Sequence, residues 1–166
     1  QMSKIEDLPR FFILGRTRSG TTMLRSMLDA HPNILVPPEF PVLTCVRNMR
    51  KTQWTEKEID QFVVKVGRCY KFSFMQITTD ALRNKLLEYY RENGKIDLHI
   101  ALKILDLLYV SPFKKSEILQ LGNKNPLYSL HVEKIRAFFP NSRFVFIRRH
   151  LLSVLESIEN ANIELH

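Results

Sequence analysis

Long hydrophobic runs and cysteine-rich motifs are missing from this chain. No apolar stretch among its 166 residues approaches the roughly 20 that a membrane-spanning helix needs, so we expect no transmembrane segment. The first residues do not have the pattern of a secretory signal. The two cysteines, Cys45 and Cys69, have no C-x-x-C spacing and lie in apolar helical surroundings. We therefore predict two buried thiols, without a disulfide or a metal site, and a cytoplasmic location.

Blocks of basic residues are also missing, although the chain as a whole is basic. It holds 25 lysines and arginines against 17 acidic residues, a net charge of +8. These basic residues are dispersed, and no recognised DNA- or RNA-binding module appears, so we expect no nucleic-acid partner. A small anionic ligand explains the excess more economically, because a basic cleft concentrates such a ligand electrostatically.

No internal repeat, low-complexity tract or linker divides the chain, and its length suits a single domain. Apolar strand-like runs alternate with amphipathic helical segments, which is typical of α/β proteins with a mainly parallel sheet flanked by helices. The predicted strands cover residues 10–15, 34–36, 118–121 and 143–147.

The predicted helices between these strands are unequally distributed. A first helix covers residues 21–30, another covers 127–139, and the last starts near Leu151. Between the second and third strands the pattern is helical throughout, which predicts an insertion at about 41–115. Its helices are predicted at 41–49, 56–68, 80–92 and 97–110.

The most informative segment is residues 15–22, with the sequence GRTRSGTT, between an apolar run and a helical pattern. A buried strand followed by a glycine-bounded turn and a helix N-terminus points several backbone N–H groups at one spot, where an anion is stabilised. The spacing is that of the nucleotide P-loop, but Thr21 stands where the P-loop has its lysine. This argues against an ordinary NTPase or kinase. Arg18 supplies a cation from within the loop instead.

Residues 18–22 (RSGTT), followed by residues 29–32 (DAHP), resemble the 5′-phosphosulfate loop of sulfotransferases that use 3′-phosphoadenosine-5′-phosphosulfate (PAPS). The likeness is closest to the tyrosylprotein sulfotransferases and their bacterial relatives. It implies a P-loop-like sulfotransferase fold with PAPS as donor and 3′-phosphoadenosine-5′-phosphate (PAP) as product. The implied donor-binding residues of this loop are Arg18, Ser19, Gly20, Thr21 and Thr22.

Two later segments extend the resemblance. Residues 124–126 (KNP) are similar to the segment in which a sulfotransferase lysine touches the transferring group, and Lys124 falls just past a predicted strand end. Residues 144–150 are similar to the strand whose final arginine, with a serine eight positions later, binds the 3′-phosphate. Arg149 and Ser157 have that separation, and Arg148 with Ser153 is the lower-ranked alternative.

The chain departs from the family pattern near this third segment. His150 and Leu151 replace the acidic residue and the proline or glycine that follow the arginine, and Ala161 stands where close relatives carry another arginine. A PAPS-dependent fold also has a further segment that closes over the adenosine. We therefore expect residues 1–166 to be a single sulfotransferase-like domain that is incomplete at its C-terminus.

Glu39 is the predicted catalytic base. It follows Pro37 and Pro38 after the second strand, where a rigid entry would hold its carboxylate near the cradle. Its distance from Arg18 resembles that of the catalytic glutamate in tyrosylprotein sulfotransferases. His31 is the competing base, because imidazole titrates near neutrality, although the resemblance gives residues 31–32 a helix-ending role.

The implied reaction moves a sulfuryl group from PAPS to an acceptor hydroxyl or amine. Glu39 takes the proton, while Arg18 and Lys124 stabilise charge on the leaving phosphate, and no metal is required. The acceptor class stays open between a small molecule, a glycan, a lipid and a peptide. Two alternatives also stay open: a non-catalytic nucleotide- or sulfate-binding module, and a P-loop kinase or NTPase.

Overall fold

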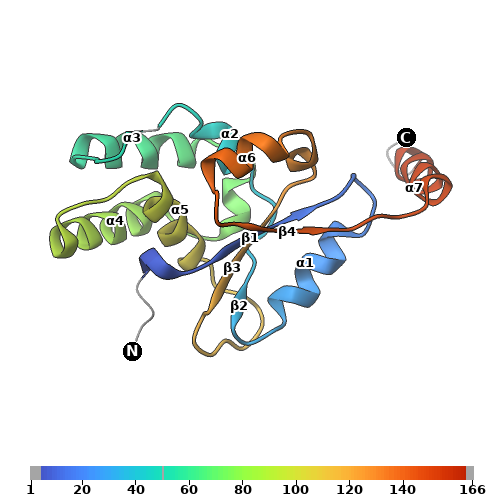
Figure 1. Ribbon diagram of the computed structural model, residues 1–166, viewed down its shortest axis with the longest axis horizontal. Coiled ribbons are helices and arrows are strands. Elements are labelled where there is room, and N and C mark those ends of the chain that lie inside the picture. Colours follow the sequence, from blue (N-terminus) through green and yellow to red (C-terminus); the bar gives the residue numbers. More distant parts are fainter. Residues whose placement is uncertain (1–4, 50, 164–166) are drawn as a thin grey trace.

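A four-stranded parallel sheet lies at the centre of the protein (Figure 1). The structure, a computed structural model, describes residues 5–49 and 51–163. Within these residues the strand order is β2-β3-β1-β4. The strands are β1 (Arg10–Leu14), β2 (Ile34–Leu35), β3 (Gln120–Lys124) and β4 (Arg143–Phe146). The predicted α/β class with a mainly parallel sheet is confirmed.

The central strand β1 is buried along its whole length. Phe12 packs into the larger core on one face of the sheet, whereas Phe11 and Ile13 belong to a smaller cluster on the other face. Successive side chains of a strand alternate between faces, and a strand covered on both sides needs apolar residues throughout. The apolar run at residues 11–14 of β1 therefore suits a strand inside the sheet.

Helices cover both faces of the sheet, as Figure 1 shows. Helix α1 (Thr21–Asp29) packs against one face through Leu24 and Leu28, beside Phe11. Between β2 and β3 the chain forms α2 (Val42–Cys45), α3 (Glu56–Gly67), α4 (Thr79–Asn93) and α5 (Leu98–Leu107). The later helices are α6 (Val132–Phe138) and α7 (Leu151–Ile163), and short 3₁₀ turns form η1 (Ile5–Asp7), η2 (Phe72–Met75) and η3 (Pro126–Leu130). Helix α7 projects away from the body.

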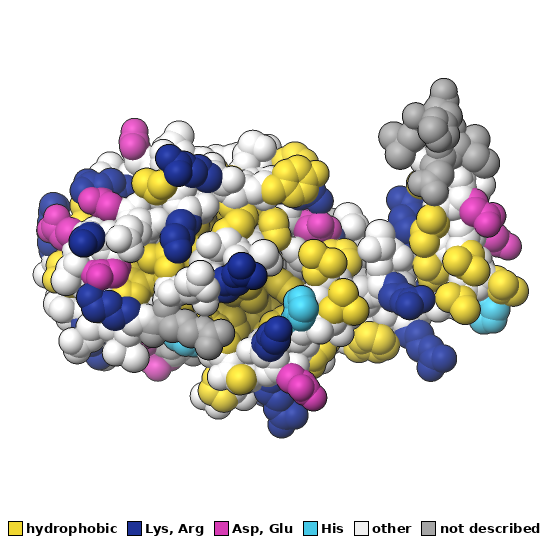
Figure 2. All heavy atoms as spheres, turned by 90° about the horizontal axis from the view of Figure 1, so that it is seen from above, with side chains coloured by type: hydrophobic (Ala, Val, Ile, Leu, Met, Phe, Trp, Pro, Cys, Tyr) yellow, Lys and Arg dark blue, Asp and Glu magenta, His cyan; other side chains and the backbone are white. Residues whose placement is uncertain are grey.

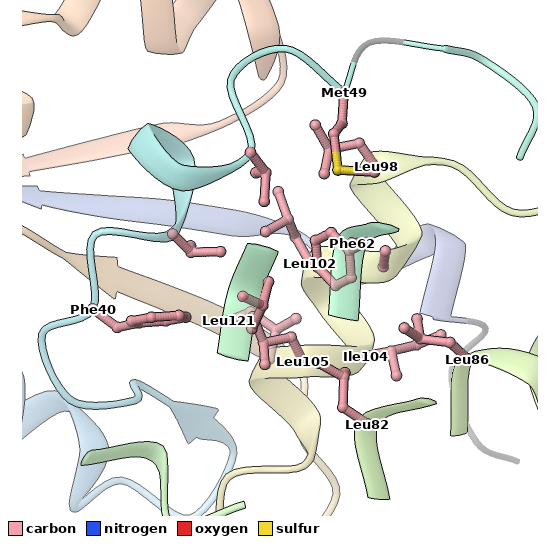
Figure 3. Packing of buried hydrophobic residues seen from close by; sticks show 14 of the residues in the cluster. Phe40, Met49, Phe62, Leu82, Leu86, Leu98, Leu102, Ile104, Leu105 and Leu121 are labelled. Atoms are coloured by element: carbon pink, nitrogen blue, oxygen red, sulfur yellow. The ribbon is translucent and has the colours of Figure 1, made fainter. Parts of the chain in front are cut away.

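The helices between β2 and β3 share one core with the sheet. Phe62 of α3, Leu102 and Leu105 of α5, and Leu121 of β3 are all buried in the same cluster (Figure 3). Helix α3 begins with a capping box, in which the Thr55 and Glu58 side chains bond reciprocally to backbone N–H groups. The inserted helices therefore pack directly onto the face that carries Phe12.

Several predicted boundaries differ from the structure. Strand β3 begins at Gln120 and runs to Lys124, later than the predicted 118–121. It continues through polar residues because they have buried partners: the Tyr128 hydroxyl donates to Asn123 Oδ1 at 2.8 Å. The predicted helix 127–139 is divided into η3 and α6 at His131, whose φ of −135° is not helical. Helix α2 is shorter than the predicted 41–49.

A buried ion pair joins β1 to the inserted helices. Arg10 Nη2 lies 2.5 Å from Asp106 Oδ2 of α5, and each side chain is only 4% exposed. Burial raises the pKa of Asp106 to about 6, although the neighbouring Arg10 charge opposes this rise. The guanidinium also lies 5.4 Å from the centre of the Phe139 ring. Removing either partner would leave an uncompensated buried group.

The two cysteines form a disulfide, so the prediction of two buried thiols was wrong. Cys45, at the end of α2, is bonded to Cys69, just after α3, and their Cα atoms are 6.0 Å apart. Sequence spacing could not reveal this pair, because the fold of α3 back onto α2 brings the two residues together. The expectation of a cytoplasmic location rested in part on free thiols, and the disulfide removes that part of its basis.

Reduction of the Cys45–Cys69 disulfide is expected to destabilise the protein. The bond closes a loop with a sequence separation of 24, and the chain-entropy model for a loop of this size gives about 3 kcal/mol. Urea unfolding with and without reductant measures the loss. The C45A/C69A double variant is the control, because reductant should leave its midpoint unchanged. Two free thiols in the native, unreduced protein would contradict the pairing.

Replacing Asp106 by alanine is expected to destabilise the fold strongly. The D106A change strands the Arg10 guanidinium without a counter-charge in the core, a situation that costs about 3–5 kcal/mol. Asp60 is the matched control, because its ion pair with Arg83 is solvent-exposed and D60A should leave stability nearly unchanged. Equal urea midpoints for the two variants would show that the buried pair does not anchor α5.

Candidate active site

The candidate site lies where β1 and β3 end. Ile13 of β1 pairs in register with Lys124, the last residue of β3. The turn that follows β1 leads into α1, so the predicted anion cradle and Lys124 come to the same edge of the sheet. In open parallel sheets this carboxyl edge is where ligands bind. Lys124 belongs to the strand itself, not to the segment just past it as predicted.

The cradle has the backbone geometry of an anion site. Gly20 adopts a left-handed conformation, with φ of 91°, directly before α1, and no side chain caps the helix. Arg18 is also left-handed, with φ of 67°, which is uncommon for a residue with a side chain. The first N–H groups of a helix lack intrahelical acceptors, and here they face the turn. A phosphate or phosphosulfate group fits this arrangement.

Gly15 fixes the start of the cradle by close packing. A Cβ atom at this position would lie 2.7 Å from Ile147 Cγ2 and 2.8 Å from Thr21 Cγ2. Its backbone N–H donates to Ser129 Oγ at 3.0 Å. Ser129, from η3, was missed by the sequence analysis, because nothing in its local pattern signals a contact 114 positions away.

Lys124 connects the cradle to the predicted base. Its side chain is only 3% exposed. The Nζ atom donates to Glu39 Oε2 at 2.7 Å and to Thr22 Oγ1 at 3.3 Å. A buried ammonium needs such partners, because desolvation disfavours an unpaired charge. The structure therefore brings together Thr22, Lys124 and Glu39, three of the predicted site residues.

Glu39 is held by a second lysine that the sequence analysis missed. Lys71 Nζ lies 3.0 Å from Glu39 Oε1, whereas Lys124 binds the other carboxylate oxygen, Oε2. Partial burial raises the pKa of Glu39, but the hydrogen bonds and charges of Lys124 and Lys71 outweigh this effect, so the pKa lies below its usual value. The carboxylate is thus ionised at neutral pH and available to accept a proton.

The predicted 3′-phosphate pair also converges on the cradle. Arg18 Nε donates to Ser157 Oγ of α7 at 3.0 Å, and Arg149 Nη1 donates to the Arg18 carbonyl at 3.2 Å. Arg18, Arg149 and Ser157 are thus neighbours around one turn. In the described part of the chain, no hydrogen bond joins Arg148 or Ser153 to this turn, which favours Arg149 and Ser157.

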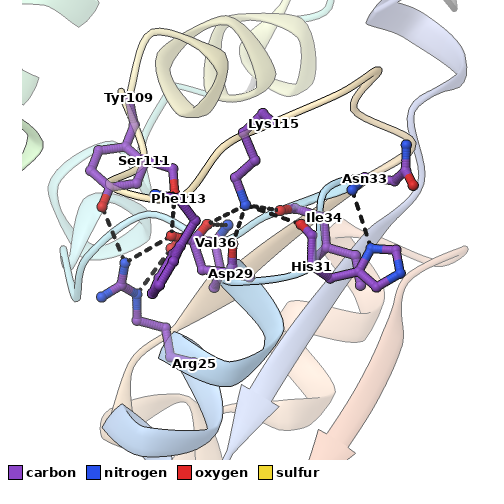
Figure 4. Close-up of polar contacts among 10 residues, drawn as sticks. All are labelled: Arg25, Asp29, His31, Asn33, Ile34, Val36, Tyr109, Ser111, Phe113 and Lys115. Carbon is purple, nitrogen blue, oxygen red and sulfur yellow. Dashed lines mark hydrogen bonds and ion pairs between the residues drawn. The ribbon is translucent and has the colours of Figure 1, made fainter.

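His31 lies at the other end of α1 from the cradle. The helix has nine residues and therefore spans roughly 13 Å at 1.5 Å per residue. His31 Nδ1 accepts from the Asn33 N–H at 3.1 Å, and its carbonyl accepts from Lys115 (Figure 4). This geometry supports Glu39 over His31 as the base.

A buried polar network around Asp29 positions the segment that leads to Glu39 (Figure 4). Asp29 is fully buried. Its Oδ1 accepts from the Val36 N–H at 2.9 Å, and its Oδ2 accepts from Ser111 Oγ at 2.7 Å. Arg25 Nε donates to the Val36 carbonyl at 2.9 Å. Helix α1 thus fixes Val36, three residues before Glu39.

An apolar cleft lies between α2 and the η3–α6 segment. It has a volume of about 350 Å³ and reaches Asn125, the residue after Lys124. Figure 2, the view from above, shows hydrophobic side chains within a hollow and basic side chains around it. The cleft is lined among others by Leu43, Val46, Tyr128, Ile135 and Phe139, with Arg47, His131 and Lys134 also contributing.

No helix within residues 5–49 and 51–163 has the length and apolar character required to span a membrane. No group of three or more histidine, cysteine, aspartate or glutamate side chains within this part gathers as a metal site would.

Comparisons with known proteins agree with this geometry. Residues 9–163 match the model of the sulfotransferase family. The protein-tyrosine sulfotransferase of Drosophila melanogaster is 25% identical over 96% of this chain and 27% of its own length. Human protein-tyrosine sulfotransferase 1 is 26% identical over 87% of this chain and 32% of its own length. The chain thus spans about a third or less of the length of these relatives.

A solved structure is similar in fold. The sulfotransferase domain from the curacin biosynthetic pathway matches with a TM-score of 0.51 and 25% identity, over 92% of this chain and 51% of that one. The resemblance inferred from the sequence motifs is confirmed. With a family model that covers nearly the whole described chain and a phosphate-type cradle at the carboxyl edge of its parallel sheet, the chain belongs to the sulfotransferase family.

Proposed function

We propose that this chain carries the donor site and the catalytic base of a PAPS-dependent sulfotransferase that modifies a hydroxyl group on a protein or peptide. The observation that carries the proposal is the position of Lys124, whose ammonium contacts both Glu39 and the cradle residue Thr22. A base and an anion site joined by one cation match the needs of in-line transfer to a hydroxyl. The relatives named as protein-tyrosine sulfotransferases support a tyrosyl acceptor.

The donor would be held at its two charged ends. The N–H groups at the start of α1, with Arg18, Ser19 and Thr22, would bind the 5′-phosphosulfate. Arg149 and Ser157, which adjoin the Arg18 turn, would bind the 3′-phosphate, since an arginine fork grips phosphate bidentately. When bound, PAPS supplies an activated sulfuryl group bonded to a phosphate that can leave.

The chain's own residues would then accept the proton and stabilise the developing negative charge. Glu39 accepts the proton of the acceptor hydroxyl as the new oxygen–sulfur bond forms. Lys124 and the cradle N–H groups would stabilise the negative charge that develops on the phosphate oxygen as its bond to sulfur breaks. The apolar cleft that reaches Asn125 would bind the side chains of the acceptor that flank the reacting hydroxyl.

The disulfide bears on the compartment in which this reaction would occur. A structural disulfide persists in oxidising surroundings and is rare in the cytosol. The Cys45–Cys69 bond therefore favours an oxidising compartment over the cytoplasm.

The first test of the donor is selectivity for PAP over ADP, because Arg149 and Ser157 would bind a 3′-phosphate that ADP lacks. Calorimetry should show tighter binding of PAP. The R149A variant should lose most of this preference, about 1.5–3 kcal/mol for a charge-assisted hydrogen bond. R148A is the control and should behave like the parent. Equal affinities of the parent for PAP and ADP would reject the donor assignment, and a larger effect of R148A would move the site by one residue.

The second test concerns the base. E39Q keeps the shape of the side chain but removes its basicity, so it should lower transfer from radiolabelled PAPS to a tyrosyl peptide by roughly 10²–10⁴-fold. PAP affinity should stay nearly unchanged. H31A is the matched control and should remain active, since His31 lies at the far end of α1. An active E39Q together with an inactive H31A would assign the base to His31. The assay uses the natural full-length protein.

A further inference from the structure

We propose that Lys71 is a positioning residue of the same site: it holds Glu39 in place while Lys124 serves the leaving group. The inference rests on the proposed function. Its starting point is that the two lysines bind different oxygens of one carboxylate. Lys71 lies 3.0 Å from Oε1, and Lys124 lies 2.7 Å from Oε2.

Lys124 has two roles that compete: it binds Glu39, and it would stabilise the leaving group at the cradle. Its Nζ atom also lies 3.3 Å from Thr22 Oγ1 in the cradle, where a negative charge would develop on the leaving phosphate. As Lys124 moves toward that charge, its contact with Glu39 weakens. Within residues 5–49 and 51–163, Lys71 has no second polar contact of this kind; its Nζ otherwise lies 5.4 Å from the centre of the Tyr70 ring. Lys71 can therefore keep the carboxylate ionised and oriented throughout the reaction.

The backbone around Lys71 is held in an unusual conformation. Lys71 has a φ of 67°, and Gln76, on the other side of η2, has a φ of 54°. Left-handed conformations are uncommon for residues with side chains and persist only where the surrounding structure enforces them. This segment directs the Lys71 ammonium toward Glu39, so the strain accompanies a contact at the site.

The segment is anchored on both sides of Lys71. Two residues earlier, Cys69 is bonded to Cys45 of α2. One residue later, the Phe72 ring packs against Phe40, with ring centres 5.9 Å apart. Phe40 directly follows Glu39, so the same packing that fixes Lys71 also fixes the carboxylate. The inserted helices thereby contribute a charged group to the site.

This ion pair differs from an ordinary surface pair. Lys85 and Glu88 lie three positions apart on α4, and both side chains are about half exposed, at 49% and 51%. The Lys71 and Glu39 side chains are only 24% and 28% exposed, and 32 positions separate them. Exposed pairs contribute little because water screens them. Lys85 is therefore a suitable control for the removal of a lysine charge.

Removal of the Lys71 charge should change how Glu39 titrates. The charged groups that face Glu39 are Lys71, from the insertion, and Lys124, from β3, and both lower its pKa against the effect of burial. Tyr128 of η3 is a further titratable neighbour, whose own pKa is raised chiefly by burial. Without Lys71 the Glu39 pKa rises, so the base becomes protonated at a higher pH. The acid limb of the kcat/KM profile should shift upward accordingly.

The experiment compares K71M, K71R and the control K85M in the natural full-length protein, with two readouts. The first is the Glu39 carboxyl titration followed by ¹³C NMR and assigned with E39Q, which needs no turnover. K71M should raise the Glu39 pKa, whereas K71R and K85M should leave it near the parent value. The second is the pH profile of transfer from PAPS. K71M should lower kcat about 10–100-fold, the scale of a misplaced catalytic group, with PAP affinity unchanged.

A double-mutant cycle separates positioning from a general loss of structure. If Lys71 acts through Glu39, K71M should add no further loss in the E39Q background. An unchanged Glu39 titration in K71M, or a full additional loss in E39Q/K71M, would overturn the proposal. Should K71M fail to fold, K71Q takes its place with the same expected results. Absence of transfer by the parent would reject the proposed function, whereas the titration still decides the role of Lys71.

Discussion

The contact on which the site depends is the buried ammonium of Lys124 between a carboxylate and a hydroxyl. An isolated charge with 3% exposure would be strongly disfavoured, so Lys124 requires the partners that Glu39 and Thr22 provide. Those partners come from different parts of the chain: Thr22 lies in the first turn of α1, which follows β1, and Glu39 follows β2. The pairing of β1 and β2 with β3 brings all three together, and the electrostatics of the site follow from strand order.

The helices between β2 and β3 do more than cover the sheet. Their apolar side chains complete the core above β1, and the Arg10–Asp106 pair ties α5 to the central strand. The same helices carry the Cys45–Cys69 disulfide and Lys71. The inserted segment can hold the Lys71 ammonium at the site because its backbone is fixed, by the Cys45–Cys69 disulfide and by the packing of Phe72 on Phe40.

Sequence patterns predicted the parallel sheet and the cradle because both are local. The apolar run at residues 11–14, the glycine-bounded turn and the start of the first helix are all encoded by neighbours in the chain. The end of β3 was misjudged, because Asn123 and Lys124 look like turn residues until their buried partners are known. The disulfide was missed for a similar reason, since a spacing of 24 residues carries no signal of proximity.

The sequence by itself therefore determined the class of fold, the anion cradle, and the identity of Arg18, Glu39, Lys124, Arg149 and Ser157 as candidates. Only the tertiary structure decided which of them meet and what else joins them. It placed His31 at the far end of α1, paired Arg18 with Ser157, and added Lys71 and Ser129 to the site. The reason is physical: backbone propensities act over a few residues, whereas ion pairs and side-chain packing depend on segments that only the folded chain brings together.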